Sequence, residues 1–104
     1  MKFIFEVTLK PSVSRQQFIE AWKKGSAIIQ KQPGAMGTEL YEKIGEDGFL
    51  AIASWKSKDA RDEAMATLKN VDAETREILD RHKELGFVKV IGNFEDSEWR
   101  VGDT

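Results

Sequence analysis

The chain has 104 residues, 40% hydrophobic and 33% charged, which is enough for one domain with a single modest core. Its 16 basic and 18 acidic residues give a formal net charge of −2, so there is no general electrostatic case for binding nucleic acid or an anionic membrane. The absence of cysteine excludes disulfides, thiolate nucleophiles and cysteine-ligated metal centres. The composition predicts one soluble domain, and we expect it in the reducing cytoplasm.

The first segment alternates between apolar and polar residues. Residues 3, 5, 7 and 9 are Phe, Phe, Val and Leu, while the residues between them are mainly polar. This period of two predicts a β-strand with one face buried away from solvent. Because Glu6 interrupts the apolar run, the segment is too short and too polar for a signal sequence or a membrane span, and we expect folded structure to begin here.

A helix is predicted after Pro11. Ser14 and Gln17 have the spacing of a capping box, which satisfies free amides at a helix start. Apolar residues then recur every three or four positions from Phe18 to Ile29, until Pro33 makes continuation unfavourable.

Two strands, residues 35–44 and 49–56, are predicted to pair antiparallel across a glycine-containing loop. A helix capped by Ser57 should follow, and Asp72 restarts the helical pattern, so this helix is broken or doubled. Gly86 is expected to end it in the left-handed conformation.

The last predicted strand covers residues 87–94, where Gly92 indicates a bulge. The order of elements predicts an α+β fold of the ferredoxin-like βαββαβ type, with a four-stranded antiparallel sheet and helices on one face. We assign residues 1–94 to this domain. Residues 95–104 form an acidic tail of net charge −3, counting Asp103, and we expect Trp99 to pack on a neighbouring molecule.

Residues 49–55 are apolar on both faces of their strand. Phe49, Ala51, Ala53 and Trp55 share one side, and Leu50 and Ile52 lie on the other. Because helices cover only one side, the second predicts a homodimer in which two sheets pack face to face. The alternative is that Leu50 and Ile52 are isolated surface residues, which are common.

Known cofactor motifs are missing from the sequence. There is no GxGxxG or phosphate-binding loop, and the single histidine, His82, excludes HExxH zinc sites and two-histidine iron sites. We therefore expect no nucleotide cofactor and no protein-bound metal. Ser26 lies inside a predicted helix without the strained turn of a GxSxG nucleophile.

Large apolar side chains are predicted to converge between the sheet and the helices and to line a cavity for a flat aromatic ligand. They are Phe5, Val7, Trp22, Met36, Phe49 and Met65. The alternative is an ordinary packed core. Trp55 is the strongest candidate, because it ends a strand just before a helix cap, where its indole N–H can face a cavity.

His82 is the candidate for proton transfer. It falls on the apolar stripe of the last helical piece, where a neutral imidazole can face a pocket. The alternative is a histidine satisfied by a backbone group or by the dimer partner. Glu6 and Glu42 are further candidate bases if they are buried, and otherwise solvated residues.

Several segments resemble the antibiotic biosynthesis monooxygenase-like domains of the dimeric α/β-barrel superfamily. They are the opening MKFIFEVTLKP, the turn PGAMG and the stretch ASWKSKDARDEA, in which Trp55 is followed by Lys56 and Ser57. The resemblance implies a homodimer that oxygenates a quinol, an anthrone or a similar phenol without metal or flavin. The deprotonated substrate would itself activate O₂, with Trp55 and His82 as the catalytic residues.

Two positions depart from the haem-degrading branch of this family. That branch has an asparagine where this chain has Val7, and a histidine shortly after the tryptophan, where this chain offers Met65. Haem is therefore a possible ligand and not an expected substrate. Two alternatives stay open: a dimer that binds a small molecule or haem without turnover, and a structural dimer whose cavity is filled by its own side chains.

Overall fold

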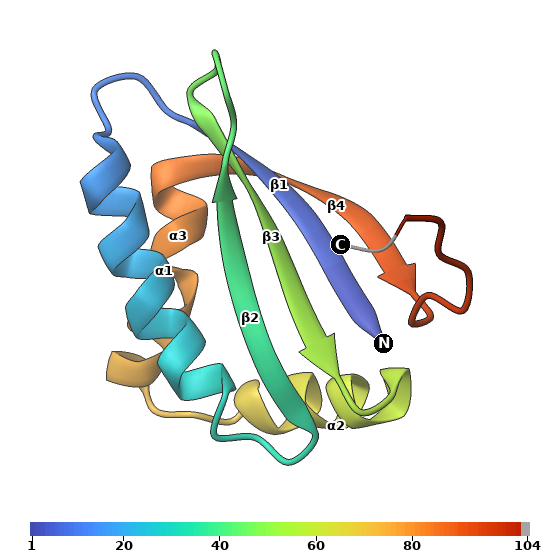
Figure 1. Ribbon diagram of the computed structural model, residues 1–104. Helices are drawn as coiled ribbons and strands as arrows, with labels where there is room; N and C mark the ends of the chain where they lie inside the picture. The colour runs from blue at the N-terminus through green and yellow to red at the C-terminus, as the bar shows by residue number, and fades with distance from the viewer. Residues whose placement is uncertain (103–104) are drawn as a thin grey trace.

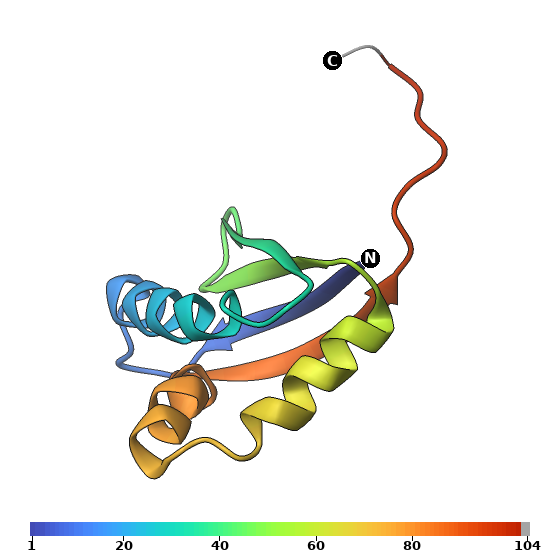
Figure 2. The same cartoon turned by 90° about the horizontal axis from the view of Figure 1, so that it is seen from below.

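One antiparallel sheet of four strands, in the order β2-β3-β1-β4, forms the centre of the computed structural model, which describes residues 1–102 (Figure 1). The elements are β1 (Lys2–Leu9), α1 (Arg15–Ile29), β2 (Ala35–Glu42), β3 (Gly48–Trp55), α2 (Lys58–Leu68), α3 (Ala73–Leu85) and β4 (Gly86–Phe94). All three helices lie on the same side of the sheet (Figure 2). The predicted ferredoxin-like α+β fold is confirmed.

Helix starts follow the predicted capping residues. The Ser14 hydroxyl accepts a hydrogen bond from the Gln17 N–H at 3.1 Å, and the Gln17 side chain accepts one from the Ser14 N–H at 2.8 Å. The Ser57 hydroxyl and the Asp72 carboxylate cap α2 and α3 separately, so the predicted break is confirmed. No helix within residues 1–102 combines the length and the apolarity needed to cross a membrane.

Gly86 corrects one prediction. Its φ of −156° is extended and not left-handed, because α3 runs directly into β4. A Cβ at this position would lie 2.5 Å from Val7 Cγ1 and 3.0 Å from the Thr8 carbonyl oxygen. Glycine is therefore needed for the close approach of two strands. Gly92, with a φ of 149°, lies at a register shift between β1 and β4, which confirms the predicted bulge.

The packed core lies between α1 and the middle of the sheet. Val7 and Phe18 are fully buried and Phe49 is 2% exposed. The rings of Phe18 and Phe49 are stacked, with centroids 5.1 Å apart. Each such side chain contributes on the order of 2 kcal/mol through burial.

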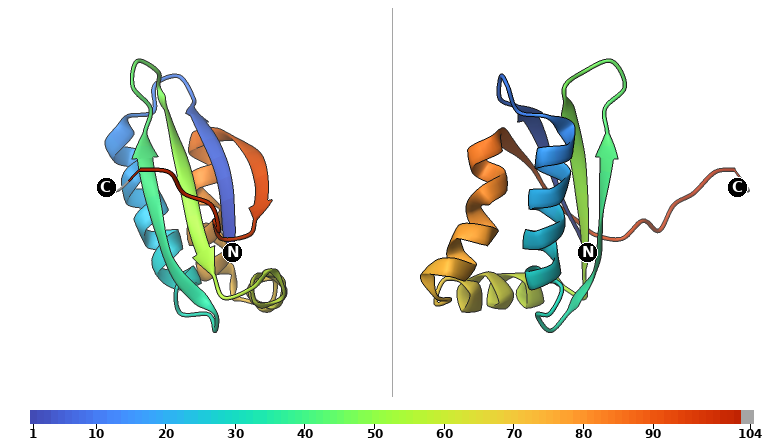
Figure 3. Two further views of the ribbon diagram at one scale, coloured as in Figure 1. Left: turned by 45° about the vertical axis from the view of Figure 1, so that its right-hand side comes forward. Right: turned by 90° about the vertical axis from the view of Figure 1, so that its left-hand side faces the viewer.

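The face of the sheet away from the helices is also apolar. The β-pairing places Leu50 opposite Tyr41, and Ile52 opposite Ile4, on this face. Residues 95–102 leave β4 and extend toward the same side, away from the helices (Figure 3). Trp99 in this arm is 84% exposed, and Asp103 of the predicted tail lies outside the described residues. Within residues 1–102, no helix covers this face.

Candidate active site

A cavity of about 430 Å³ lies between the helix-covered face of the sheet and the three helices. Residues of small volume create this space, because Ala21 and Gly25 on α1 face it together with Ala53 on β3. Val88 and Val90, on the edge strand β4, also line it and are 38% and 57% exposed. The cavity therefore opens to solvent along β4.

Three of the six predicted substrate-binding residues and both predicted catalytic residues line this cavity. They are Phe5, Trp22, Met65, Trp55 and His82. Trp55 is only 2% exposed and packs against Met1 and Ala64, so its indole forms part of the wall. A cavity that touches Trp55 argues against an interior filled by the chain's own side chains.

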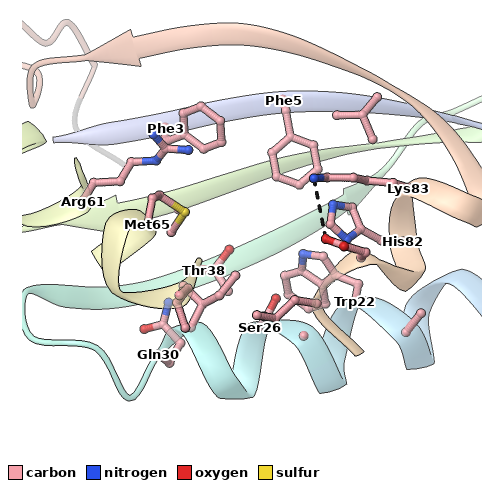
Figure 4. A pocket seen from close by; sticks show the side chains of 18 of the residues that line it. Phe3, Phe5, Trp22, Ser26, Gln30, Thr38, Arg61, Met65, His82 and Lys83 are labelled. Carbon is pink, nitrogen blue, oxygen red and sulfur yellow. Dashed lines mark ion pairs between the residues drawn. The ribbon is translucent and has the colours of Figure 1, made fainter. Parts of the chain in front are cut away.

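His82 projects from α3 toward the rings of Phe5 and Trp22 (Figure 4). Its ring centroid lies 6.2 Å from that of Phe5. Burial lowers the pKa of His82, the neighbouring Lys83 charge lowers it further, and a hydrogen bond with the Leu79 backbone opposes the shift. The lowered pKa favours the neutral imidazole, which is the form that can accept a proton.

Three residues predicted to line the cavity lie elsewhere. Val7 and Phe49 belong to the solid core around Phe18, because they occupy the end of the sheet that α1 covers tightly. Met36 is 66% exposed, since a register irregularity between residues 35 and 38 of β2 turns its side chain outward. Their expected contact with a ligand is not supported by this placement.

The two candidate carboxylate bases also lie outside the cavity. Glu6 pairs with Lys43, with 3.5 Å between the carboxylate and ammonium atoms. Glu42 accepts a hydrogen bond of 2.7 Å from Arg15. Both are in ion pairs outside the cavity, so His82 is the one predicted base that lines it.

Phe3 and Arg61 are among the cavity residues that the sequence did not predict. Phe3 shares its strand face with Phe5, so the alternation of β1 already contained that signal. Arg61 lies four residues before Met65 and seven before Leu68, on one face of α2, but a charged side chain in an apolar stripe was not recognised as a lining residue.

The charged groups around the cavity are mostly basic. Arg61, Lys69, Arg76 and Lys83 line it against one acidic residue, Asp80. The Asp80 carboxylate lies 3.3 Å from Arg76 Nε and 3.7 Å from Lys83 Nζ. In the part of the chain that the structure describes, no three His, Asp or Glu side chains gather as metal ligands.

Comparison with family models finds no match, and no curated protein sequence matches the chain. Solved structures do match. A variant of SnoaB, a cofactor-independent oxygenase from Streptomyces nogalater, superposes with a TM-score of 0.75 at 17% identity, covering 98% of this chain and 96% of that one.

Two further structures show the same similarity. A "putative antibiotic biosynthesis monooxygenase" from Nitrosomonas europaea has a TM-score of 0.63 at 13% identity and covers 90% and 98% of the two chains. The Arabidopsis thaliana protein At3g17210 has a TM-score of 0.70 at 16% identity, covering 95% and 98%. The chain therefore has the fold of the antibiotic biosynthesis monooxygenase-like domains.

Proposed function

We propose that this chain is a cofactor-independent monooxygenase that oxidises a quinol, an anthrone or a similar electron-rich phenol. The observation that carries the proposal is the partly buried imidazole of His82, the one imidazole of the chain, in the wall of a largely apolar cavity of about 430 Å³, where burial lowers its pKa. A cavity of this size accommodates a flat ligand of two or three fused rings. The fold shared with SnoaB, a cofactor-independent oxygenase, supports the same chemistry.

The proposed reaction starts with proton transfer from the substrate to His82. The resulting anion gives one electron to O₂, and the two radicals combine into a carbon-bound peroxide. The peroxide takes back the proton held by His82, which restores the imidazole. For an anthrone, loss of water from this hydroperoxide converts the CH₂ carbon into a carbonyl. One oxygen atom of O₂ enters the product and the other leaves as water, so no external reductant is needed.

The protein contributes orientation and exclusion of water. The rings of Phe5 and Trp22 flank His82 and provide flat surfaces against which an aromatic substrate stacks (Figure 4). Holding the acidic C–H or O–H bond against the imidazole converts an encounter in solution into a reaction within a complex. Trp55 lines the cavity in the cluster that also includes Phe3 and Met65.

Oxygen uptake with 1,8-dihydroxyanthrone tests the proposal, with the autoxidation rate measured without protein and subtracted. We expect uptake that saturates with substrate, and one ¹⁸O atom in the product under ¹⁸O₂. His82→Gln should lower kcat/KM by about 10²-fold or more, as expected for loss of a general base. Arg81→Gln, an exposed change on the same helix that does not line the cavity, is the matched control.

Absence of uptake above the background across a panel of anthrones and quinols would contradict the proposal. If the same compounds, or hemin, bind saturably to the cavity without turnover, the chain is a binding protein and not an oxygenase. Hemin binding that is lost in His82→Gln would identify that histidine as a ligand of the haem iron.

We also propose that a second copy of the chain covers the open face of the sheet. This face carries Leu50 and Ile52 together with Lys89 and Glu6 opposite each other, so it offers both apolar area and charges of both signs to a twofold copy. The arm of residues 95–102 extends to the same side (Figure 3) and presents the exposed Trp99 there. The molecular mass of the protein in solution tests this proposal, because a dimer has twice the mass of the chain.

A further inference from the structure

Arg61 occupies an unusual position for a charged residue. Its guanidinium carbon lies 3.7 Å from the centroid of the Phe3 ring, so the planar group is stacked on the wall of the cavity (Figure 4). The side chain is partly buried, and this burial lowers the pKa of Arg61. A guanidinium nevertheless stays protonated, so a positive charge is held in a poorly solvated place.

No protein group in residues 1–102 forms a hydrogen bond or an ion pair with the Arg61 guanidinium. The neighbouring Asp62 carboxylate is bound by Lys58 at 2.8 Å. Other arginines of the chain have such partners: Arg76 donates to the Leu68 carbonyl at 3.0 Å, and Arg15 donates to Glu42 at 2.7 Å. A purely structural arginine would be expected to have one too.

The surroundings of the cavity are positive although the chain is acidic. Four basic residues line it against Asp80 alone, and Asp80 is already close to Arg76 and Lys83. The formal charge of the whole chain is −2. This local excess of positive charge favours a ligand that carries an anionic group.

We propose that the ligand of this cavity is a flat aromatic molecule with a carboxylate or a similar anionic oxygen group, and that Arg61 binds this group. A guanidinium donates two parallel hydrogen bonds to a carboxylate, and the stacking on Phe3 holds its plane in advance. The inference rests on the proposed function in placing the substrate in this cavity, and it names the class to which that substrate belongs.

The position of Arg61 also orients the ligand. Arg61 and Met65 lie toward one end of the cavity, and His82 and Trp22 toward the other (Figure 4). A ligand whose anionic group is bound at Arg61 therefore directs its far ring toward His82. Arg61 is a positioning residue that selects for substrates with an acidic group at a distance from the reacting carbon.

Binding of two probes of equal shape tests this inference without any turnover. The probes are anthracene-2-carboxylate and its neutral amide, anthracene-2-carboxamide, titrated into the full chain by calorimetry at pH 7.5 and 150 mM NaCl. We expect the carboxylate to bind more tightly than the amide by a factor on the order of ten to a hundred, the range typical of a hydrogen-bonded charged group. Arg61→Gln should abolish this difference and leave the amide affinity within about twofold.

Two further variants make the test specific. Arg61→Lys keeps the positive charge but lacks the planar guanidinium that donates two parallel hydrogen bonds. It should retain part of the preference for the carboxylate over the amide. Arg81→Gln removes a positive charge from α3 outside the cavity and should leave the preference unchanged. Melting temperatures of all variants show that each is folded.

Equal affinity of the unmodified chain for the two probes would overturn the inference. So would a preference that survives in Arg61→Gln, or one that disappears instead in Lys83→Gln, because the anion would then bind elsewhere. If the carboxylate preference depends on Arg61 but no anthrone or quinol is oxidised, the inference stands and the proposed oxygenase function fails. If neither probe binds, the cavity is not a site for aromatic ligands and the inference is wrong.

Discussion

The two faces of the sheet have similar apolar residues but very different surroundings. On the helix-covered face, Val7, Phe49 and Trp55 are at most 2% exposed, and their burial is complete within one chain. On the open face, Leu50 and Ile52 are only partly buried and Phe87 is 62% exposed. The comparison teaches that apolarity on the first face explains the fold, whereas apolarity on the second is not explained within one chain and is the surface that the proposed dimer would cover.

The helix-covered face is itself divided in two. Around Phe18 it is filled by buried side chains, with the rings of Phe18 and Phe49 stacked. Toward Met65 it is hollow, because small residues on α1 and β3 leave the cavity open. We therefore expect the Phe18 end to contribute most to stability, and the proposed ligand to bind toward the Met65 end.

The largest expected effect is on the open face. Ile52→Glu should convert a dimer into a monomer, weakening association on the order of a thousandfold, because each copy would bury an unpaired carboxylate. Sedimentation at micromolar concentration measures this. Ile44→Glu, on a side chain that is fully exposed in the loop before β3, is the control and should leave the mass unchanged. An unmodified chain that is already monomeric would contradict the proposed dimer.

Phe18→Ala should be the most damaging change on the helix-covered face. It removes a fully buried ring that stacks on Phe49, and we expect a loss of about 3 to 5 kcal/mol in the free energy of unfolding. Met65→Ala, at the hollow end, should cost at most about 2 kcal/mol because its side chain already borders the cavity. Urea denaturation compares the two, and equal losses would argue against a division of this face.

Gly86→Ala should cost about 1 to 3 kcal/mol, because the added methyl meets Val7 and the Thr8 carbonyl where β1 and β4 come together. Gly25→Ala is the matched control. A Cβ there lies 3.6 Å from the nearest atom, an ordinary contact inside a helix, so this variant should be neutral or more stable. If both substitutions are harmless, the close approach at Gly86 is not what requires glycine.

The smallest effect is the pH dependence that His82 adds to stability. Because burial lowers the pKa of His82 in the folded chain, the unfolded chain binds the proton more readily as the pH falls. The stabilisation is present above the pKa of the unfolded state and is lost as the pH falls through the folded-state pKa. Between pH 7.5 and 5, the unmodified chain should lose more stability than His82→Gln, by less than about 1.4 kcal/mol per pH unit. If the free energy of unfolding changes equally with pH in the unmodified chain and in His82→Gln, His82 is not desolvated in the folded chain.

Local patterns predicted most of the fold correctly. The alternation in β1, the capping box at Ser14 and the restart at Asp72 each depend on residues only a few positions apart, so they are readable without knowing the rest of the chain. The prediction for Gly86 was wrong because the reason for that glycine is contact with β1, more than 75 residues earlier in the sequence.

The candidate site was predicted only in part. Phe5, Trp22, Met65, Trp55 and His82 line the cavity, and their apolar spacing indicated the inner side of the fold. The same spacing does not distinguish a residue that lines a cavity from one in a solid core, which is why Val7 and Phe49 were included. Arg61 was missed because its role depends on the ring of Phe3, on a different element.

The sequence by itself determined the elements, their caps, the ferredoxin-like order and the double apolarity of β3, because each depends on side-chain periodicity or on short-range hydrogen bonds. Only the tertiary structure decided where the interior is solid and where it is hollow. It also decided that the Arg61 guanidinium stacks on the cavity wall without a hydrogen-bonded or ion-paired partner among residues 1–102. Those features depend on the volumes and charges of side chains that come together from distant segments of the chain. A local sequence pattern therefore does not predict them.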